Sequence, residues 1–282
     1  MIGARAYGLL SNDPARGPLV FAAAAGLVGL PADADAVGVA TLVDGAALLS
    51  RVPAVRPGTG LKDVVGAPRG RATVIQVGSQ RELRPQGPDQ SLNIGPFRAR
   101  SYAAAVVGGP QDPDEAAASR ERLLASLPDF LRRFVAGSSE GEAFFLAILG
   151  QLHVKSVLDA AHSNGPLLHG ALQAAEGLSG TSAPRQVTLT NGVEILHAAR
   201  GMPAAILLQS GLPEDVAGAF DPNLVDSSAG RERLRRFRGV LTIGALDEPL
   251  RTGLAVPSGG QLQLMPEGGA VLVERDLSPR PL

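Results

Sequence analysis

Residues 37–52 read VGVATLVDGAALLSRV, with two largely apolar runs on either side of Asp44-Gly45. An Asp-Gly pair favours the two-residue turn of a β-hairpin, because that turn needs positive φ angles, which these residues tolerate. Residues 186–190 and 193–198 flank Asn191-Gly192 in the same way. The sequence therefore predicts two hairpins, each pairing its strands in antiparallel fashion.

The sequence also predicts strands and helices on either side of these hairpins. Further strands are expected at Ala4–Leu10, Ala72–Val77, Tyr102–Val107, 204–209, 240–243, 261–265 and 270–274. Helices are expected at 18–30, 112–136 with a break at Pro128, 138–161 and 166–176. The third of these helices carries one apolar stripe at spacings of three and four, made of Phe144, Phe145, Ile148, Leu149 and Leu152.

This order of elements lacks the regular alternation of strands and helices found in doubly wound sheets. It fits two sheets packed face to face, with helices outside. The sequence shows no internal repeat and no clear linker, so a single domain over residues 1–282 is predicted.

Composition excludes several kinds of function. The 282 residues carry a net charge of −1, which gives no overall attraction to nucleic acid or to acidic membranes. There is no cysteine, so disulfides, thiolate zinc sites and thiol catalysis are absent. The four histidines lack metal-site spacing, and no metal or cofactor is expected.

The apolar run Leu19–Leu30 and the triplet Ala32-Asp33-Ala34 resemble a secretory signal and its cleavage site. The segment before that run is longer than a signal's basic front end and contains Asp13. No apolar run reaches the roughly 18 residues that a membrane span requires. We therefore expect a cytoplasmic protein.

Short motifs, in order along the chain, resemble those of class II glutamine amidotransferases. They are residues 1–8 (MIGARAYG), 11–14 (SNDP), 127–132 (LPDFLR), 137–142 (GSSEGE), 187–192 (VTLTNG) and 246–249 (LDEP). The resemblance implies an α+β fold of the Ntn-hydrolase type. This is a four-layer αββα sandwich of two mainly antiparallel sheets flanked by helices.

The resemblance also implies which positions would carry catalysis and substrate binding. In that family an N-terminal cysteine attacks the amide carbon of glutamine, and its own α-amine serves as the base. Asn and Gly form the oxyanion hole, while Arg and Asp hold the amino-acid end of glutamine.

Here those positions are occupied differently. Ala4 stands at the cysteine and is preceded by three residues, Gly78 stands at the arginine, and Gly108-Gly109 stand at the Asn-Gly pair. Glu140 stands at the aspartate, and Asp35 and Gly38 remain from a further family loop. We expect no catalysis, because groups that act as a unit lose nearly all activity once one is gone.

Two of these positions can also be explained by local structure alone, without a function. Gly108-Gly109 is typical of a tight turn after a strand. Glu140 falls in the first turn of a predicted helix, where a carboxylate complements the helix dipole or caps the helix.

A surface for another protein is the remaining candidate site. Its members are Arg81 and Arg84 in the loop-like stretch 78–96, together with Arg231, Arg233, Arg235, Arg236 and Arg238. Only Phe237 is interleaved with the second group, so nucleic-acid binding is disfavoured. A solvated face or a site for an acidic partner protein fits better.

Three classes of function remain open. The preferred one is a pseudoenzyme that acts as a subunit, scaffold or regulator in a hetero- or homo-oligomeric complex. The second is a module that binds an amino-acid-like small molecule in the former glutamine pocket. The third is an enzyme with rebuilt chemistry, using Ser79, Asp35 or Glu140.

Overall fold

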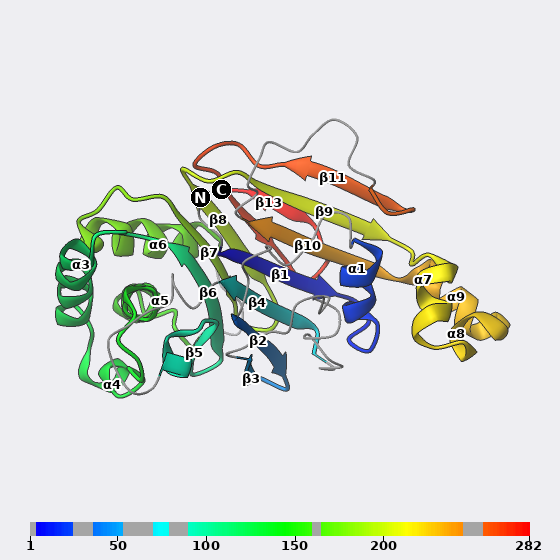
Figure 1. Ribbon diagram of the computed structural model, residues 1–282, viewed down its shortest axis with the longest axis horizontal. Helices are drawn as coiled ribbons and strands as arrows, with labels where there is room; N and C mark the ends of the chain where they lie inside the picture. The colour runs from blue at the N-terminus through cyan, green and yellow to red at the C-terminus, as the bar shows by residue number, and fades with distance from the viewer. Residues whose placement is uncertain (1–3, 25–35, 53–69, 79–89, 160–164, 245–255) are drawn as a thin grey trace.

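The computed structural model describes residues 4–24, 36–52, 70–78, 90–159, 165–244 and 256–282. Two sheets stack face to face, and helices cover both outer faces (Figure 1). Every strand pair recorded in them is antiparallel. The α+β sandwich expected from the sequence is confirmed.

The first sheet has seven strands in the described part of the chain. Their order is β11 (Gly260–Leu264), β9 (Ala204–Ser210), β10 (Arg238–Gly244), β1 (Arg5–Ser11), β4 (Ala72–Gly78), β2 (Ala36–Val43) and β3 (Ala46–Val52). The second sheet has six, in the order β13 (Pro279–Pro281), β12 (Ala270–Val273), β8 (Ile195–Arg200), β7 (Arg185–Thr190), β6 (Tyr102–Gly108) and β5 (Phe97–Ala99).

The first predicted hairpin is confirmed by its register and its turn. In β2 and β3, Val43 lies opposite Ala46, so the turn consists of two residues, Asp44 and Gly45. Their φ angles are +49° and +79°, the left-handed region that such a turn requires.

The second hairpin exists, but its turn is longer than predicted. Thr190 lies opposite Ile195, so β8 begins two residues later than expected. The side chain of Asn191 explains the difference, because its Oδ1 accepts hydrogen bonds from the N–H groups of Val193 and Glu194, each at 3.0 Å. This Asx turn replaces strand pairing for those residues.

The predicted central helices are found, the first two with shorter bounds and the last, predicted at 166–176, with longer ones. The stretch 112–136 divides at Pro128 into α3 (Pro113–Ala125) and α4 (Asp129–Arg132). Helix α5 (Glu140–Val154) ends before residue 161 and is followed by Ser156 at a φ of +58°. Helix α6 spans Gly165–Ser179, and a short 3₁₀ turn, η1, spans Gln90–Asn93.

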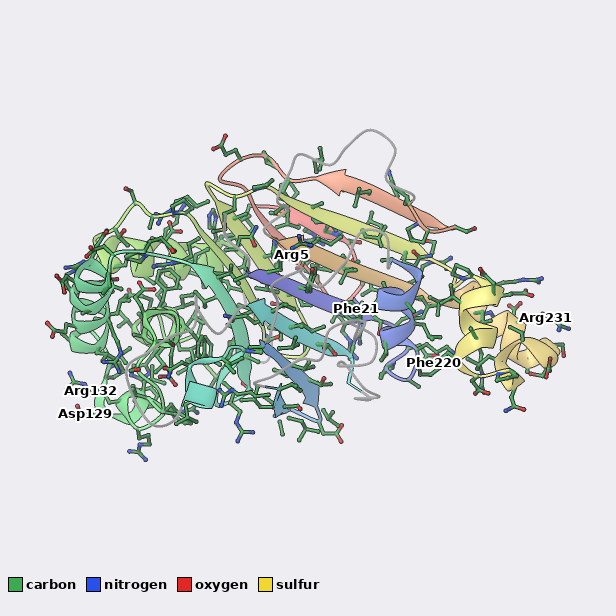
Figure 2. The ribbon with its side chains drawn as sticks, viewed as in Figure 1. Arg5, Phe21, Asp129, Arg132, Phe220 and Arg231 are labelled. Atoms are coloured by element: carbon green, nitrogen blue, oxygen red, sulfur yellow. The ribbon has the colours of Figure 1, made fainter. Side chains whose placement is uncertain are left out.

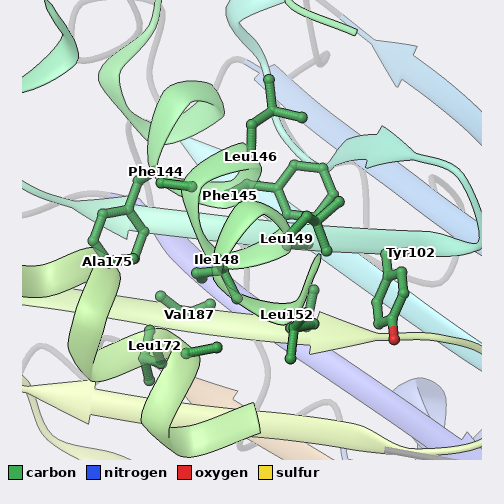
Figure 3. Close-up of a cluster of buried hydrophobic side chains, with 14 of the residues drawn as sticks. Tyr102, Phe144, Phe145, Leu146, Ile148, Leu149, Leu152, Leu172, Ala175 and Val187 are labelled. Atoms are coloured by element: carbon green, nitrogen blue, oxygen red, sulfur yellow. The ribbon is translucent and has the colours of Figure 1, made fainter. Parts of the chain in front are cut away.

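The largest apolar cluster lies between these helices and the second sheet. Figure 3 shows Phe144, Phe145, Ile148, Leu149 and Leu152 of α5 gathered with Leu172 of α6, Val187 of β7 and Tyr102 of β6. All of them are buried, which confirms the apolar stripe predicted for this helix. Because dispersion and burial scale with area, this layer fixes α5 firmly against the sheet.

The first sheet is covered by shorter helices. These are α1 (Gly17–Ala23), α7 (Glu214–Phe220), α8 (Asn223–Asp226) and α9 (Ser228–Arg236). Phe21 of α1, together with Leu234 and Phe237 at the end of α9, packs into the apolar cluster on this side. Helix α1 is shorter than predicted in the described chain, and residues 25–35 lie outside it. No described helix has the length and apolar character needed to cross a membrane.

Candidate functional site

Five of the described positions lie near one another at one end of the sandwich, namely Ala4, Gly78, Gly108, Gly109 and Glu140. Ala4 immediately precedes β1, and Arg5 lies opposite Val77 of β4. The start of β1 and the end of β4 are therefore neighbours, which places Ala4 beside Gly78. Ala4 is only 7% exposed and belongs to an apolar cluster between the sheets that includes Val107 and Met202. The methyl group of Ala4 is thus packed against apolar side chains.

Gly108 ends β6 and Gly109 follows it, both in a backbone conformation that favours glycine. Their φ angles are +83° and +104°. A Cβ on Gly108 would overlap the carbonyl oxygen of Pro184 and lie 2.6 Å from Cε of Met202. The N–H of Gly109 donates a hydrogen bond to that same carbonyl at 2.9 Å. The one backbone donor expected at an oxyanion hole is therefore bonded within the protein.

Glu140 is held by two donors on neighbouring elements. Its Oε1 accepts from Nη2 of Arg185 at 2.6 Å and from Oγ of Ser119 at 2.7 Å. The Arg185 side chain is fully buried and that of Glu140 is 9% exposed. The guanidinium also lies over the ring of Phe144, with Cζ 3.9 Å from the ring centroid. Burial lowers the pKa of Arg185 below its usual range, while Glu140 opposes that shift.

Sequence reasoning missed Arg185 as part of this site. It opens β7, whose other residues read as an ordinary buried strand. A fully buried arginine is rare unless paired, and pairing with Glu140 requires the fold to be known.

Helix α5 is capped by Ser139, and not by Glu140, for which the sequence had suggested a capping role. Oγ of Ser139 accepts from the N–H of Glu142 at 3.2 Å. The Glu142 carboxylate accepts from the N–H groups of Ala136 at 3.0 Å and Gly137 at 2.8 Å. Burial raises the pKa of Glu142, and these two bonds counter the rise. Glu140 is thereby left free of the cap and available to Arg185.

The three histidines that the structure describes belong to no metal site. Among the described residues no group of three or more His, Asp or Glu side chains could hold a metal ion. His153 packs edge-on against Phe130, with ring centroids 4.7 Å apart. His197 is fully buried, and its Nδ1 lies 2.8 Å from Oγ1 of Thr188. His162 falls outside the described residues.

The predicted arginine surface is partly visible. Arg233, Arg235, Arg236 and Arg238 are exposed, whereas Arg231 is half-buried and donates to the carbonyl of Val225. Figure 2 shows Arg231 and Phe220 at the end of the molecule formed by α7, α8 and α9, with Asp129 and Arg132 at the opposite end. Arg81, Arg84, Ser79 and Asp35 lie outside the described residues, as does the motif at 246–249.

Comparison with known proteins identifies the fold. No protein-family model and no curated protein sequence matches the chain. Among solved structures it resembles a glutamine aminotransferase class-II domain protein from Silicibacter pomeroyi. The identity is 14% and the TM-score 0.54, over 99% of this chain and 98% of that one.

A second similar structure is described as the allosteric regulatory enzyme of purine biosynthesis, with 12% identity and a TM-score of 0.51. The match covers 99% of this chain but only 48% of that enzyme, so the chain spans about half its length. Together with the two stacked antiparallel sheets, these matches show that the chain has the Ntn-type sandwich fold of class II glutamine amidotransferase domains.

Proposed function

We propose that the protein is a catalytically inactive class II glutamine amidotransferase-like pseudoenzyme that serves as a subunit, scaffold or regulator in a protein complex. The observation that carries the proposal is the burial of Ala4 in an apolar cluster at the start of β1. The position that corresponds to the family's nucleophile therefore offers only a methyl group. Amide hydrolysis through a covalent intermediate needs a nucleophilic atom there.

The neighbouring positions support the same proposal. The N–H of Gly109 donates to the carbonyl of Pro184, so that donor is not directed at a developing oxyanion. Glu140, at the position that would bind the amino group of glutamine, is already paired with Arg185. Gly78 has no side chain with which to hold a carboxylate.

A glutaminase assay tests the catalytic half of the proposal. Purified protein incubated with glutamine should release ammonia at the rate of the protein-free blank. The matched control is Ala4→Val, which alters the nucleophile position and should change nothing. Glutamate formation that scales with protein concentration, survives repurification and falls in Ala4→Val would overturn the proposal.

The complex-forming half rests on the exposed arginines of α9 and the segment that follows it. Arginine and aromatic side chains dominate the energies of protein interfaces. Phe220, 55% exposed, lies on α7, which contacts α9. Affinity capture from the native cell, followed by mass spectrometry, should recover a stoichiometric partner with an acidic surface. Recovery of the chain alone, as a monomer by size-exclusion chromatography, counts against this half.

A further inference from the structure

A cavity of about 160 Å³ lies between α6 and the helix-facing side of the second sheet. Its roof is one face of α6, where His169 and Glu176 are spaced seven residues apart. Its floor is formed by β7 and β8, including Ala198, and by the start of β12. It is separate from the apolar cluster around Ala4, which lies between the two sheets.

Two arginines face each other across the floor of this cavity. Arg185 of β7 and Arg200 of β8 are directly opposite in the antiparallel register, and both line the cavity. Like charges placed directly opposite on neighbouring strands destabilise a sheet unless something compensates them. Arg200 accordingly contributes to lowering the pKa of Arg185.

Glu140 and Glu176 balance the two positive charges, but they leave several guanidinium N–H groups without an acceptor. Glu140 accepts from Nη2 of Arg185, but Nε and Nη1 of that buried guanidinium have no hydrogen-bond acceptor among the described residues. Nη2 of Arg200 donates to the carbonyls of Ala183 at 2.8 Å and Thr181 at 3.3 Å. Its Nη1 is 3.5 Å from Oε2 of Glu176, and its buried Nε has no acceptor in the same part of the chain.

We propose that this cavity binds a small oxyanion, a phosphate or a carboxylate, between Arg185 and Arg200. Buried N–H donors that lack an acceptor cost free energy, and charge-assisted bonds to an oxyanion would remove that cost. Glu176 competes for the same arginine. Its side chain is 24% exposed and can turn toward water when the anion enters. The proposal does not rest on the pseudoenzyme function, although both involve Arg185, which also pairs with Glu140.

Isothermal titration calorimetry of the full chain tests the proposal, with inorganic phosphate and acetate as separate ligands and chloride at equal ionic strength as the reference. Arg200→Gln should weaken binding about tenfold or more, because it removes one of the two guanidinium groups. Glu176→Gln should strengthen binding severalfold, because it removes the competing carboxylate. Arg236→Gln, on the exposed side of α9, is the matched control and should bind as the wild type does.

Ala198→Leu provides a test that changes no charge, since it adds bulk to the cavity floor. It should abolish binding while the far-ultraviolet circular dichroism spectrum stays that of the wild type. Binding of phosphate alone assigns a phosphoryl-bearing ligand, and binding of acetate alone assigns a carboxylate. The proposal is overturned if neither anion binds beyond chloride, or if Glu176→Gln and Arg200→Gln shift the affinity in the same direction.

Discussion

Arg185 donates from Nη2 to Oε1 of Glu140 over 2.6 Å, and this bond joins the first residue of β7 to the first residue of α5. The pair is nearly inaccessible to water, and Phe144 covers one face of the guanidinium. Because both charges are desolvated, each depends on the other far more than in a surface ion pair.

Breaking this pair should destabilise the fold strongly. Glu140→Ala leaves a buried guanidinium without its counter-charge, and we expect a loss of about 3–5 kcal/mol in the free energy of unfolding. The double variant Glu140→Ala/Arg185→Met should lose less than the sum of the single variants. Urea unfolding followed by circular dichroism measures all three.

The matched comparison is the exposed pair of Arg236 and Glu232, where Nε and Oε1 are 2.7 Å apart. Its removal should cost under about 1 kcal/mol. Additive losses at Arg185 and Glu140 would show that the two residues are not coupled.

The turn at Gly108 should tolerate no side chain. Gly108→Ala combines a positive φ with an overlap between the new Cβ and the Pro184 carbonyl. Gly268→Ala is the control, because its φ of +71° is similar but nothing lies within 4 Å of the added Cβ. We expect about 1 kcal/mol for the control and about 1–3 kcal/mol more for Gly108→Ala, measured as thermal unfolding. Equal losses would mean that strain in φ alone fixes this turn.

His197 should make stability depend on acid pH. Burial lowers its pKa to about 4 in the folded protein, against 6.5 for the exposed group. The unfolded chain therefore takes up a proton first as the pH falls, so this histidine lowers stability progressively from about pH 6.5 to about pH 4. The full loss is about 3 kcal/mol, from about 1.4 kcal/mol per pKa unit.

Replacing His197 by Gln should flatten the dependence of the unfolding free energy on pH across that window. The idea is refuted if His197→Gln keeps the pH dependence of the wild type.

The sheets could be predicted from local signals, and the site mostly could not. Asp44-Gly45 fixes its hairpin because only residues that accept positive φ close a two-residue turn. Asn191-Gly192 looks similar in sequence, but the Asn191 side chain bonds the backbone ahead and lengthens the turn. The sequence pattern alone does not reveal whether such a pair forms a two-residue turn or a longer turn closed by the Asn side chain.

The ion pair illustrates a second limit. Arg185 and Glu140 are 45 positions apart, and no periodic pattern in the sequence indicates that they pair. Only the packing of α5 on the second sheet brings them together. Ser139 caps α5, a role that sequence reasoning had allowed for Glu140. The Glu142 carboxylate reaches back to Ala136 and Gly137, a contact that depends on the path of the preceding loop.

The exposed arginines at the end of α9 form the surface proposed to bind a partner. Leu234 and Phe237 anchor this segment in the apolar cluster of the first sheet, so the arginines between and beside them are held outward. Reversing Arg235 and Arg236 to glutamate should therefore leave the fold intact, since exposed substitutions usually cost under about 0.5 kcal/mol. The same double variant should weaken a complex with an acidic partner by tenfold or more.

Arg132→Glu/Arg133→Glu is the matched control. It reverses two exposed arginines at the opposite end of the molecule, where Figure 2 labels Arg132. Ala4→Val tests the alternative that a partner or ligand uses the apolar end of the sandwich. Capture of the partner with each immobilised variant distinguishes these cases. If the arginine surface is the interface, only Arg235→Glu/Arg236→Glu loses the partner, and raising the salt concentration weakens the wild-type complex in the same direction. Retention of the partner by that variant, together with its loss from folded Ala4→Val, would place the interface at the former glutamine pocket instead.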